Sequence, residues 1–170
     1  MPICNKFIVD LLSMSVEHKM NSKYLLGWRE WVSLPELGIE RIKCKIDTGA
    51  RTSALHAFYI DPFMIDDIKM IRFGIHPFAK DMTTVLHCEA KVIDERLVTS
   101  SDGNRSMRYV ISTTMVLGDI KKDIELTLTN RDTMRFRMLL GRKAMDDGCI
   151  VDPALSYQKA KPIFCKVNKN

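Results

Sequence analysis

Apolar and basic residues alternate one by one along the segment 41–46, where Ile42, Cys44 and Ile46 are each preceded by Arg or Lys. A period of two places the apolar side chains on one face of an extended strand and the charged ones on the other. The same alternation returns along the segment 120–129. We therefore expect a protein built mainly from half-buried β-strands.

Turn sequences join these strands into hairpins. Pro-Glu-Leu-Gly at residues 35–38 and an Asp-Gly step at 102–103 each separate two strand-like runs. A short apolar run leads through Gly141 into a short helix, and the strand spacing is typical of a small barrel or sandwich. The expected strands cover residues 28–34, 41–46, 69–73, 85–98, 107–117, 120–129 and 137–140.

The chain divides into a main unit and two flanking segments. Residues 24–157 contain the strand pattern and form the expected domain. Residues 1–23 are expected to be a peripheral leader with a short helix near residues 7–14, and residues 158–170 a C-terminal tail.

Length and composition exclude several classes of protein. The 170 residues suit one ordinary domain and are too few for a (β/α)₈ barrel of about 250 residues. The net charge of +5 is compatible with an acidic ligand, but no run of five like charges indicates a nucleic-acid-binding tail. No apolar run of 18 residues predicts a membrane span. Five cysteines without a C-x-x-C pair, and no signal-peptide pattern, favour a reducing cytoplasm.

Asp47, Thr48 and Gly49 follow directly on the alternating strand 41–46. A carboxylate at a strand end, followed by a hydroxyl residue and a glycine, can be oriented in a tight loop by backbone N–H groups. A plain β-turn is the alternative. The apolar-apolar-Gly sequence at residues 139–141, on a strand that leads into a helix, favours the functional interpretation.

The order of these elements resembles that of the retropepsins, so the chain looks like one half of an aspartic peptidase. It is more closely similar to the bacterial RimK-associated retropepsin-like proteins, a family also called RimB-like or "ATP-dependent zinc protease". The resemblance covers about residues 24–157 and implies a closed β-barrel of the acid-protease type with a short C-terminal helix. The motifs that carry it are residues 27–32, 45–57, 128–131, 138–142 and 150–153.

The resemblance implies a pair of catalytic carboxylates formed by two copies of Asp47, in loops shaped by Thr48 and Gly49. Two carboxylates about 3 Å apart repel by roughly 5 kcal/mol at an effective dielectric constant of 20. They would therefore share one proton and hold a water molecule between them. The sequence contains no second Asp-Thr-Gly or Asp-Ser-Gly, so the partner carboxylate must come from a two-fold homodimer.

Further site residues follow from the same match. The tip at residues 100–105 would be a flap that closes over a peptide or protein substrate. Leu139, Leu140 and Gly141 would pack beneath the Asp47 loop, and Arg108 is a weaker candidate for contact with an acidic group. The expected substrate-binding residues are Ala50, Arg51, Ser101, Asp102, Gly103, Arg131 and Arg142.

Two other functions stay open. A zinc peptidase could use His56, His76 and a carboxylate, although H-E-x-x-H is absent. Alternatively, the barrel could bind an acidic peptide or a ligase without cutting. No Gly-rich phosphate loop occurs, so we expect no nucleotide and no other cofactor. The resemblance implies a link to RimK-type ATP-grasp ligases and to glutamylated substrates.

Overall fold

The computed structural model describes residues 24–78, 81–99, 103–130, 135–145 and 148–162. The expected helix near residues 7–14 and the candidate residues Ser101, Asp102 and Arg131 lie outside these ranges.

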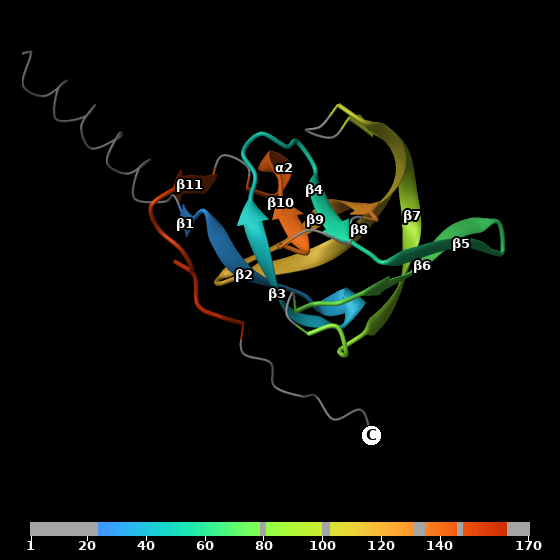
Figure 1. Cartoon of the computed structure of the whole chain (residues 1–170), viewed down its shortest axis with the longest axis horizontal. Helices are drawn as coiled ribbons and strands as arrows, with labels where there is room; N and C mark the ends of the chain where they lie inside the picture. Colours follow the sequence, from blue (N-terminus) through green and yellow to red (C-terminus); the bar gives the residue numbers. More distant parts are fainter. Residues whose placement is uncertain (1–23, 79–80, 100–102, 131–134, 146–147, 163–170) are drawn as a thin grey trace, which may run out of the picture.

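Strands dominate the described residues, as the sequence predicts (Figure 1). A 3₁₀ turn (Pro35–Leu37) and a short helix, α2 (Arg142–Met145), accompany them. The strands are β1 (Tyr24–Gly27), β2 (Arg29–Leu34), β3 (Ile39–Ile46), β4 (Ser53–His56), β5 (Tyr59–Ile65), β6 (Ile68–Ile75), β7 (Leu86–Thr99), β8 (Arg105–Leu117), β9 (Ile120–Thr129), β10 (Met138–Leu140) and β11 (Cys149–Asp152).

Six of these strands close into a barrel. They follow one another in the order β2, β3, β10, β4, β9 and β8, and a bridge between Ser33 and Val116 returns β8 to β2. The closed barrel with one short helix confirms the expected fold class.

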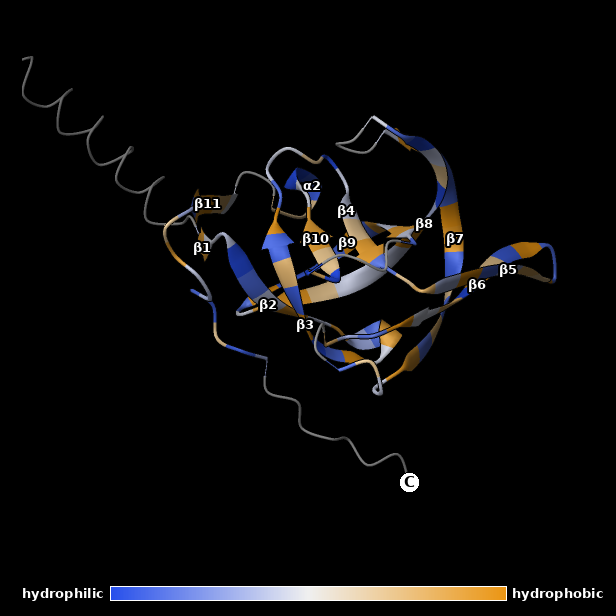
Figure 2. Ribbon diagram, in the orientation of Figure 1, coloured by the Kyte–Doolittle hydropathy of each residue, from blue (hydrophilic) through white to orange (hydrophobic). Residues whose placement is uncertain are grey.

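The barrel closes around the apolar faces that the alternation predicts. In β3, Ile42, Cys44 and Ile46 are buried while the residues between them are exposed. Figure 2 shows the same change of hydropathy along neighbouring strands. The largest side chains that are fully buried include Leu34, Ile39, Ile42, Leu55, Phe73, Ile111, Met115 and Leu126.

A second group of strands, β7, β6 and β5, continues from β8 away from the barrel. Their outer hairpin projects at one side of the molecule in Figure 1. Asp66 and Asp67, at its turn, have φ values of 44° and 63°, as a two-residue hairpin turn of type I′ requires. The expected strand 69–73 is the second arm of this hairpin; its partner β5 was not anticipated, because Asp-Asp is a weaker turn signal than Asp-Gly.

A buried carboxylate in β2 binds the backbone at residue 27 and at residues 158–159. Glu30 is fully buried and accepts hydrogen bonds from the backbone N–H groups of Gly27, Gln158 and Lys159, at 2.7, 2.9 and 3.2 Å. These charge-assisted bonds satisfy a carboxylate that would otherwise be costly to bury. The parallel pair β1–β11 lies beside this anchor, on the side of the molecule opposite the β5–β6 hairpin (Figure 1).

Candidate functional site

Strand β10 holds both ends of the loop that contains Asp47. It lies between β3, to which it is parallel, and β4, to which it is antiparallel. Its central residue Leu139 pairs with Lys45 before the loop and with Ala54 after it. The loop of residues 47–52 is therefore fixed at both ends by one strand from a distant part of the sequence.

The Asp47 carboxylate is oriented by its own loop. The backbone N–H groups of Gly49 and Ala50 donate hydrogen bonds to Asp47 Oδ1 at 3.1 and 3.2 Å. The Asp47 N–H donates to the Leu140 carbonyl at 2.9 Å, which ties the residue to β10. Asp47 is half-buried and Thr48 and Gly49 are exposed, so solvent reaches a carboxylate whose plane is already set.

Gly141 allows β10 to approach this loop closely. A Cβ atom at this position would lie 2.7 Å from the Thr52 carbonyl carbon and 3.0 Å from the Arg51 oxygen. The Gly141 N–H donates to the buried Ser53 hydroxyl at 3.0 Å. Only glycine fits between these backbone atoms, which gives the apolar-apolar-Gly sequence its structural meaning.

The arginines near the loop occupy different positions. Arg142 donates from Nη1 to the carbonyl oxygens of Thr48 and Gly49, at 2.7 and 3.0 Å, and so braces the loop. Arg51 is exposed and its carbonyl accepts a hydrogen bond from the Lys143 N–H. Ala50 is half-buried, and its carbonyl accepts from the Arg142 N–H at 2.9 Å.

The expected flap corresponds to the long β7–β8 hairpin. Its described ends, Thr99 and Arg105, pair with each other and lie on the same side of the barrel as the β3–β4 loop (Figure 1). Gly103 at the tip has φ +81°, and no atom lies within 4 Å of the position of an added Cβ. The hairpin therefore has the length and open surroundings that a mobile cover needs.

A pocket with room for about 30 Å³ opens on the outer face of the barrel, toward the ends of β4 and β10 that lie away from the Asp47 loop. Its strands are β4, β8, β9 and β10. Apolar residues Ala54, Phe136 and Leu139 line it together with Thr129 and the basic residues His56, Arg108 and Arg137. The sequence did not predict that Arg137 and His56 line this pocket. Both residues lie on or next to short strands, and only the register between the strands shows which of their positions face outward.

The two histidines of the zinc hypothesis have different surroundings. His56 is buried in β4. His76 follows β6, stacks on Phe58 with ring centroids 4.6 Å apart, and has Nδ1 3.3 Å from the Thr84 carbonyl oxygen. Among the described residues, no group of three or more His, Cys, Asp or Glu side chains is arranged to hold a metal ion.

Two buried thiols are unsuited to nucleophilic chemistry. Burial raises the pKa of Cys44 to about 12 and that of Cys88 to about 11. Both thiols therefore stay protonated at neutral pH, and the thiolate is the reactive form.

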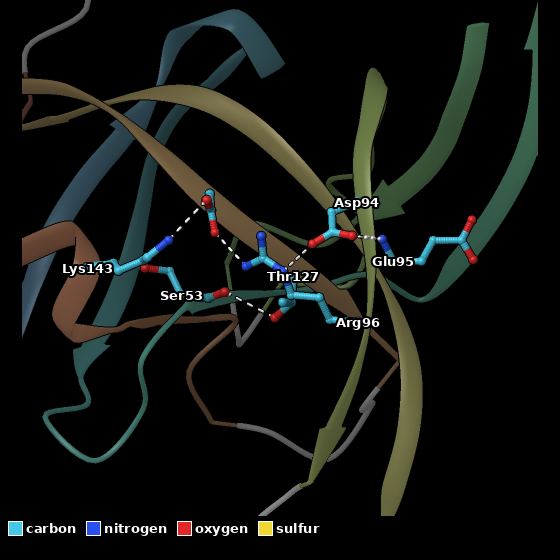
Figure 3. Close-up of polar contacts among 7 residues, drawn as sticks. Ser53, Asp94, Glu95, Arg96, Thr127 and Lys143 are labelled. Carbon is cyan, nitrogen blue, oxygen red and sulfur yellow. Dashed lines mark hydrogen bonds and ion pairs between the residues drawn. The ribbon is translucent and has the colours of Figure 1, made fainter.

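Charged side chains connect the helix α2, behind the loop, with strand β7 of the hairpin (Figure 3). Lys143 of α2 pairs with Glu125 of β9, Glu125 pairs with Arg96 of β7, and Arg96 pairs with Asp94. The Arg96 guanidinium lowers the pKa of both carboxyl groups, with Lys143 adding to the effect on Glu125. The chain of ion pairs joins the two elements that flank the candidate site.

The closed barrel and its strand-end Asp-Thr-Gly loop define a retropepsin-like protein. The family model described as "RimB-like: Retropepsin-like aspartic endopeptidase RimB" matches residues 25–162. The chain belongs to this family.

Curated relatives have longer chains. The chain is 49% identical over 134 residues to a probable alpha-L-glutamate ligase of Desulfotalea psychrophila, and 44% identical over 137 residues to one of Shewanella pealeana. The matches cover 79% and 81% of this chain and 29% and 30% of those relatives. The chain thus spans about three tenths of the length of the curated relatives that it matches.

A solved structure has the same fold. A Legionella pneumophila protein of unknown function is 28% identical, with a TM-score of 0.67, and the alignment covers 81% of this chain and 98% of that one. In the part of the present chain that the structure describes, no helix is long and apolar enough to cross a membrane.

Proposed function

We propose that this protein is an aspartic peptidase that hydrolyses amide bonds in peptides or proteins. The observation that carries the proposal is the Asp47 carboxylate, whose Oδ1 accepts two backbone N–H groups in a loop braced by Gly141 and Arg142. Both hydrogen bonds are accepted by Oδ1. They orient the carboxylate and do not involve Oδ2. Such preorganisation is what acid–base catalysis needs.

The proposed reaction needs two copies of the chain. Each copy contributes one Asp47, and a two-fold axis brings the identical carboxylates face to face. One carboxylate accepts a proton from the attacking water, and its protonated partner donates a proton to the substrate carbonyl oxygen. In the tetrahedral diol that results, the first carboxyl group gives its proton to the leaving amine while the second takes back the diol proton, and the C–N bond breaks. Thr48 and Gly49 hold the loop, and the β7–β8 hairpin covers the bound peptide.

Strands β1 and β11 are the proposed contact between the two copies. Tyr24, Leu25 and Ile150 are 40%, 41% and 43% exposed on this two-stranded sheet. Exposed apolar side chains on a small sheet at the edge of the molecule favour association with a like surface. This supports a homodimer in which the β1–β11 sheets of the two copies meet.

We further propose that the substrates are glutamylated proteins made by an ATP-grasp ligase. The relatives named as glutamate ligases contain the matching segment within a longer chain, which supports a shared pathway of addition and removal. The net charge of +5 agrees with an acidic substrate. A reducing cytoplasm is the proposed location, because Cys44 and Cys88 are buried free thiols.

A mixing experiment tests the paired carboxylates. Purified protein is incubated with an oligoglutamylated peptide, and cleavage is measured for the wild type, for Asp47→Asn and for mixtures re-equilibrated as dimers. If each site needs two Asp47 side chains, an equal mixture keeps about one quarter of the wild-type activity, the statistical share of unmixed dimers, rather than about one half. Asp47→Asn alone should be inactive.

Other outcomes would refute the proposal. Cleavage that survives Asp47→Asn, or that chelators alone abolish, would favour the zinc mechanism. A wild type that is monomeric and binds the peptide without cutting it would favour a binding module. Both results differ from the outcome that the paired site predicts, in which activity falls with the square of the wild-type fraction in the mixture.

A further inference from the structure

One row of paired residues crosses the outer face of five neighbouring strands. Lys45 pairs with Leu139, Leu139 with Ala54, Ala54 with Thr127, and Thr127 with Val110. Directly paired residues point to the same face of a sheet. Asp47 follows Lys45 by two residues, so the period of two places it toward this face as well.

The basic residues of the pocket form a second row on the same face. Arg137 immediately precedes β10, and His56 and Arg108 lie on β4 and β8; each is two residues from a member of the first row. The strand directions place this basic row on the side of the first row away from Asp47. Measured along the strands alone, at about 3.3 Å per residue, the first row lies about 7 Å and the basic row about 13 Å from Asp47. The separation between strands adds to these distances, because His56 and Arg108 are on strands that do not neighbour β3.

The pocket combines an apolar floor with a basic rim. Ala54, Leu139 and Phe136 supply the apolar part, and Phe136 is held by an edge contact with Trp28 at 5.6 Å between ring centroids. None of the described lining residues carries a carboxylate. With room for only about 30 Å³, the pocket is far smaller than the roughly 300–1,000 Å³ typical of whole ligands, and admits the end of a side chain.

We infer that this pocket binds a carboxylate side chain of the substrate, with Arg108 and Arg137 as the residues that determine specificity. The inference rests on the proposed function and extends it, because it names the residues of this face that determine acidic specificity. The two methylene groups of a glutamate side chain match the floor, and its carboxylate matches the guanidinium groups.

The contacts that Arg137 makes with other residues are compatible with this role. Arg137 is 6% exposed and donates from Nη2 to Met82 Sδ at 3.5 Å. A guanidinium has five N–H donors, so an arginine that is held by other contacts still presents donors to a ligand. A fixed guanidinium is also better preorganised than a mobile one.

Binding measurements in an Asp47→Asn background test the pocket without turnover. The ligands are two fluorescent octapeptides, one of glutamate and one of glutamine, and affinity is measured by anisotropy. We expect the glutamate peptide to bind at least about 10-fold more tightly, since hydrogen bonds between charged groups contribute about 1.5–3 kcal/mol. Arg108→Gln should remove most of this preference.

Matched variants separate a specific site from general charge. Arg41→Gln removes the same charge at an exposed position of β3, and should leave the preference unchanged. Arg137→Lys keeps the positive charge but removes the bidentate guanidinium. It should weaken binding of the glutamate peptide and leave binding of the glutamine peptide unchanged. Thermal unfolding of each variant checks that the fold is retained.

The results that would overturn the inference are distinct from those that concern catalysis. Equal binding of both peptides by the parent, or equal loss in Arg108→Gln and Arg41→Gln, would refute the pocket, as would a preference abolished by Arg51→Gln alone. Hydrolysis by the wild type is followed separately. If both peptides are cleaved at the same rate, the acidic specificity of the pocket is refuted and the peptidase activity is supported. If the glutamate peptide binds selectively but is not cleaved, the pocket is supported and the peptidase activity is refuted.

Discussion

The Asp47 loop and the β5–β7 extension are stabilised in opposite ways. The loop is fixed by buried backbone contacts, in which Gly141 touches Thr52 and donates to Ser53. The extension is crossed by solvent-exposed ion pairs such as Arg72–Glu89, whose side chains are 48% and 49% exposed. Exposed pairs contribute little and are screened by salt. The loop that positions the Asp47 carboxylate is thus held by buried contacts, whereas the β5–β7 extension is crossed by weak exposed ion pairs.

Gly141→Ala should have the largest effect, because it disrupts the buried contacts that fix the Asp47 loop. The new Cβ would meet the Thr52 backbone at 2.7 Å, and backbone atoms within a barrel cannot move aside as a flexible side chain can. We expect a loss of about 2–4 kcal/mol in the free energy of unfolding, measured by denaturant titration, together with loss of peptide cleavage.

Gly148→Ala is the matched control, because an added Cβ there has no atom within 4 Å. It should change the free energy of unfolding by less than about 0.5 kcal/mol. Equal effects of the two substitutions would show that the close approach at Gly141 is not what fixes the loop.

Ser53→Ala should have a smaller effect on the same contact. It leaves the Gly141 N–H buried without the Ser53 Oγ acceptor, at a cost of about 1–3 kcal/mol. Ser112→Ala, an exposed serine on β8, serves as the control. If Ser53→Ala unfolds at the same denaturant concentration as this control, the hydrogen bond does not contribute to stability.

The sequence predicts the parts of this contrast that depend on local pattern. The alternation in β3 and β9 and the turn at Pro35–Leu37 were enough to predict the hairpins and the mainly β fold. The Asp47 loop and the strand with Gly141 were recognised by their motifs. That β10 inserts between β3 and β4 depends on pairing between distant segments, which no local pattern encodes.

The same reason explains what was missed at the pocket. Arg137 and Arg108 are more than twenty residues apart in the sequence and meet because β10, β4, β9 and β8 lie side by side. Contact between Arg142 and substrate stays a prediction; in the structure its guanidinium donates to the Thr48 and Gly49 carbonyls. An arginine that follows a strand-end glycine has the same sequence signal whether it braces the loop or also contacts substrate.

The smallest effect is expected at the ion pairs between the two regions, where Glu125 lies between Arg96 and Lys143 (Figure 3). The Arg96 hydrogen bond lowers the pKa of Glu125 below its ordinary value of 4.5. A carboxyl group with a lowered pKa in the folded state stabilises the fold above its ordinary pKa, and this contribution is lost as the pH falls through the lowered value. Glu125→Gln should therefore cost up to about 1 kcal/mol at pH 7 and progressively less below about pH 4.5, as measured by urea titration over that range. Glu40→Gln, at an exposed position of β3, should show no such trend. A difference between Glu125→Gln and the wild type that stays constant with pH would mean that side-chain packing, rather than charge, links α2 to the hairpin.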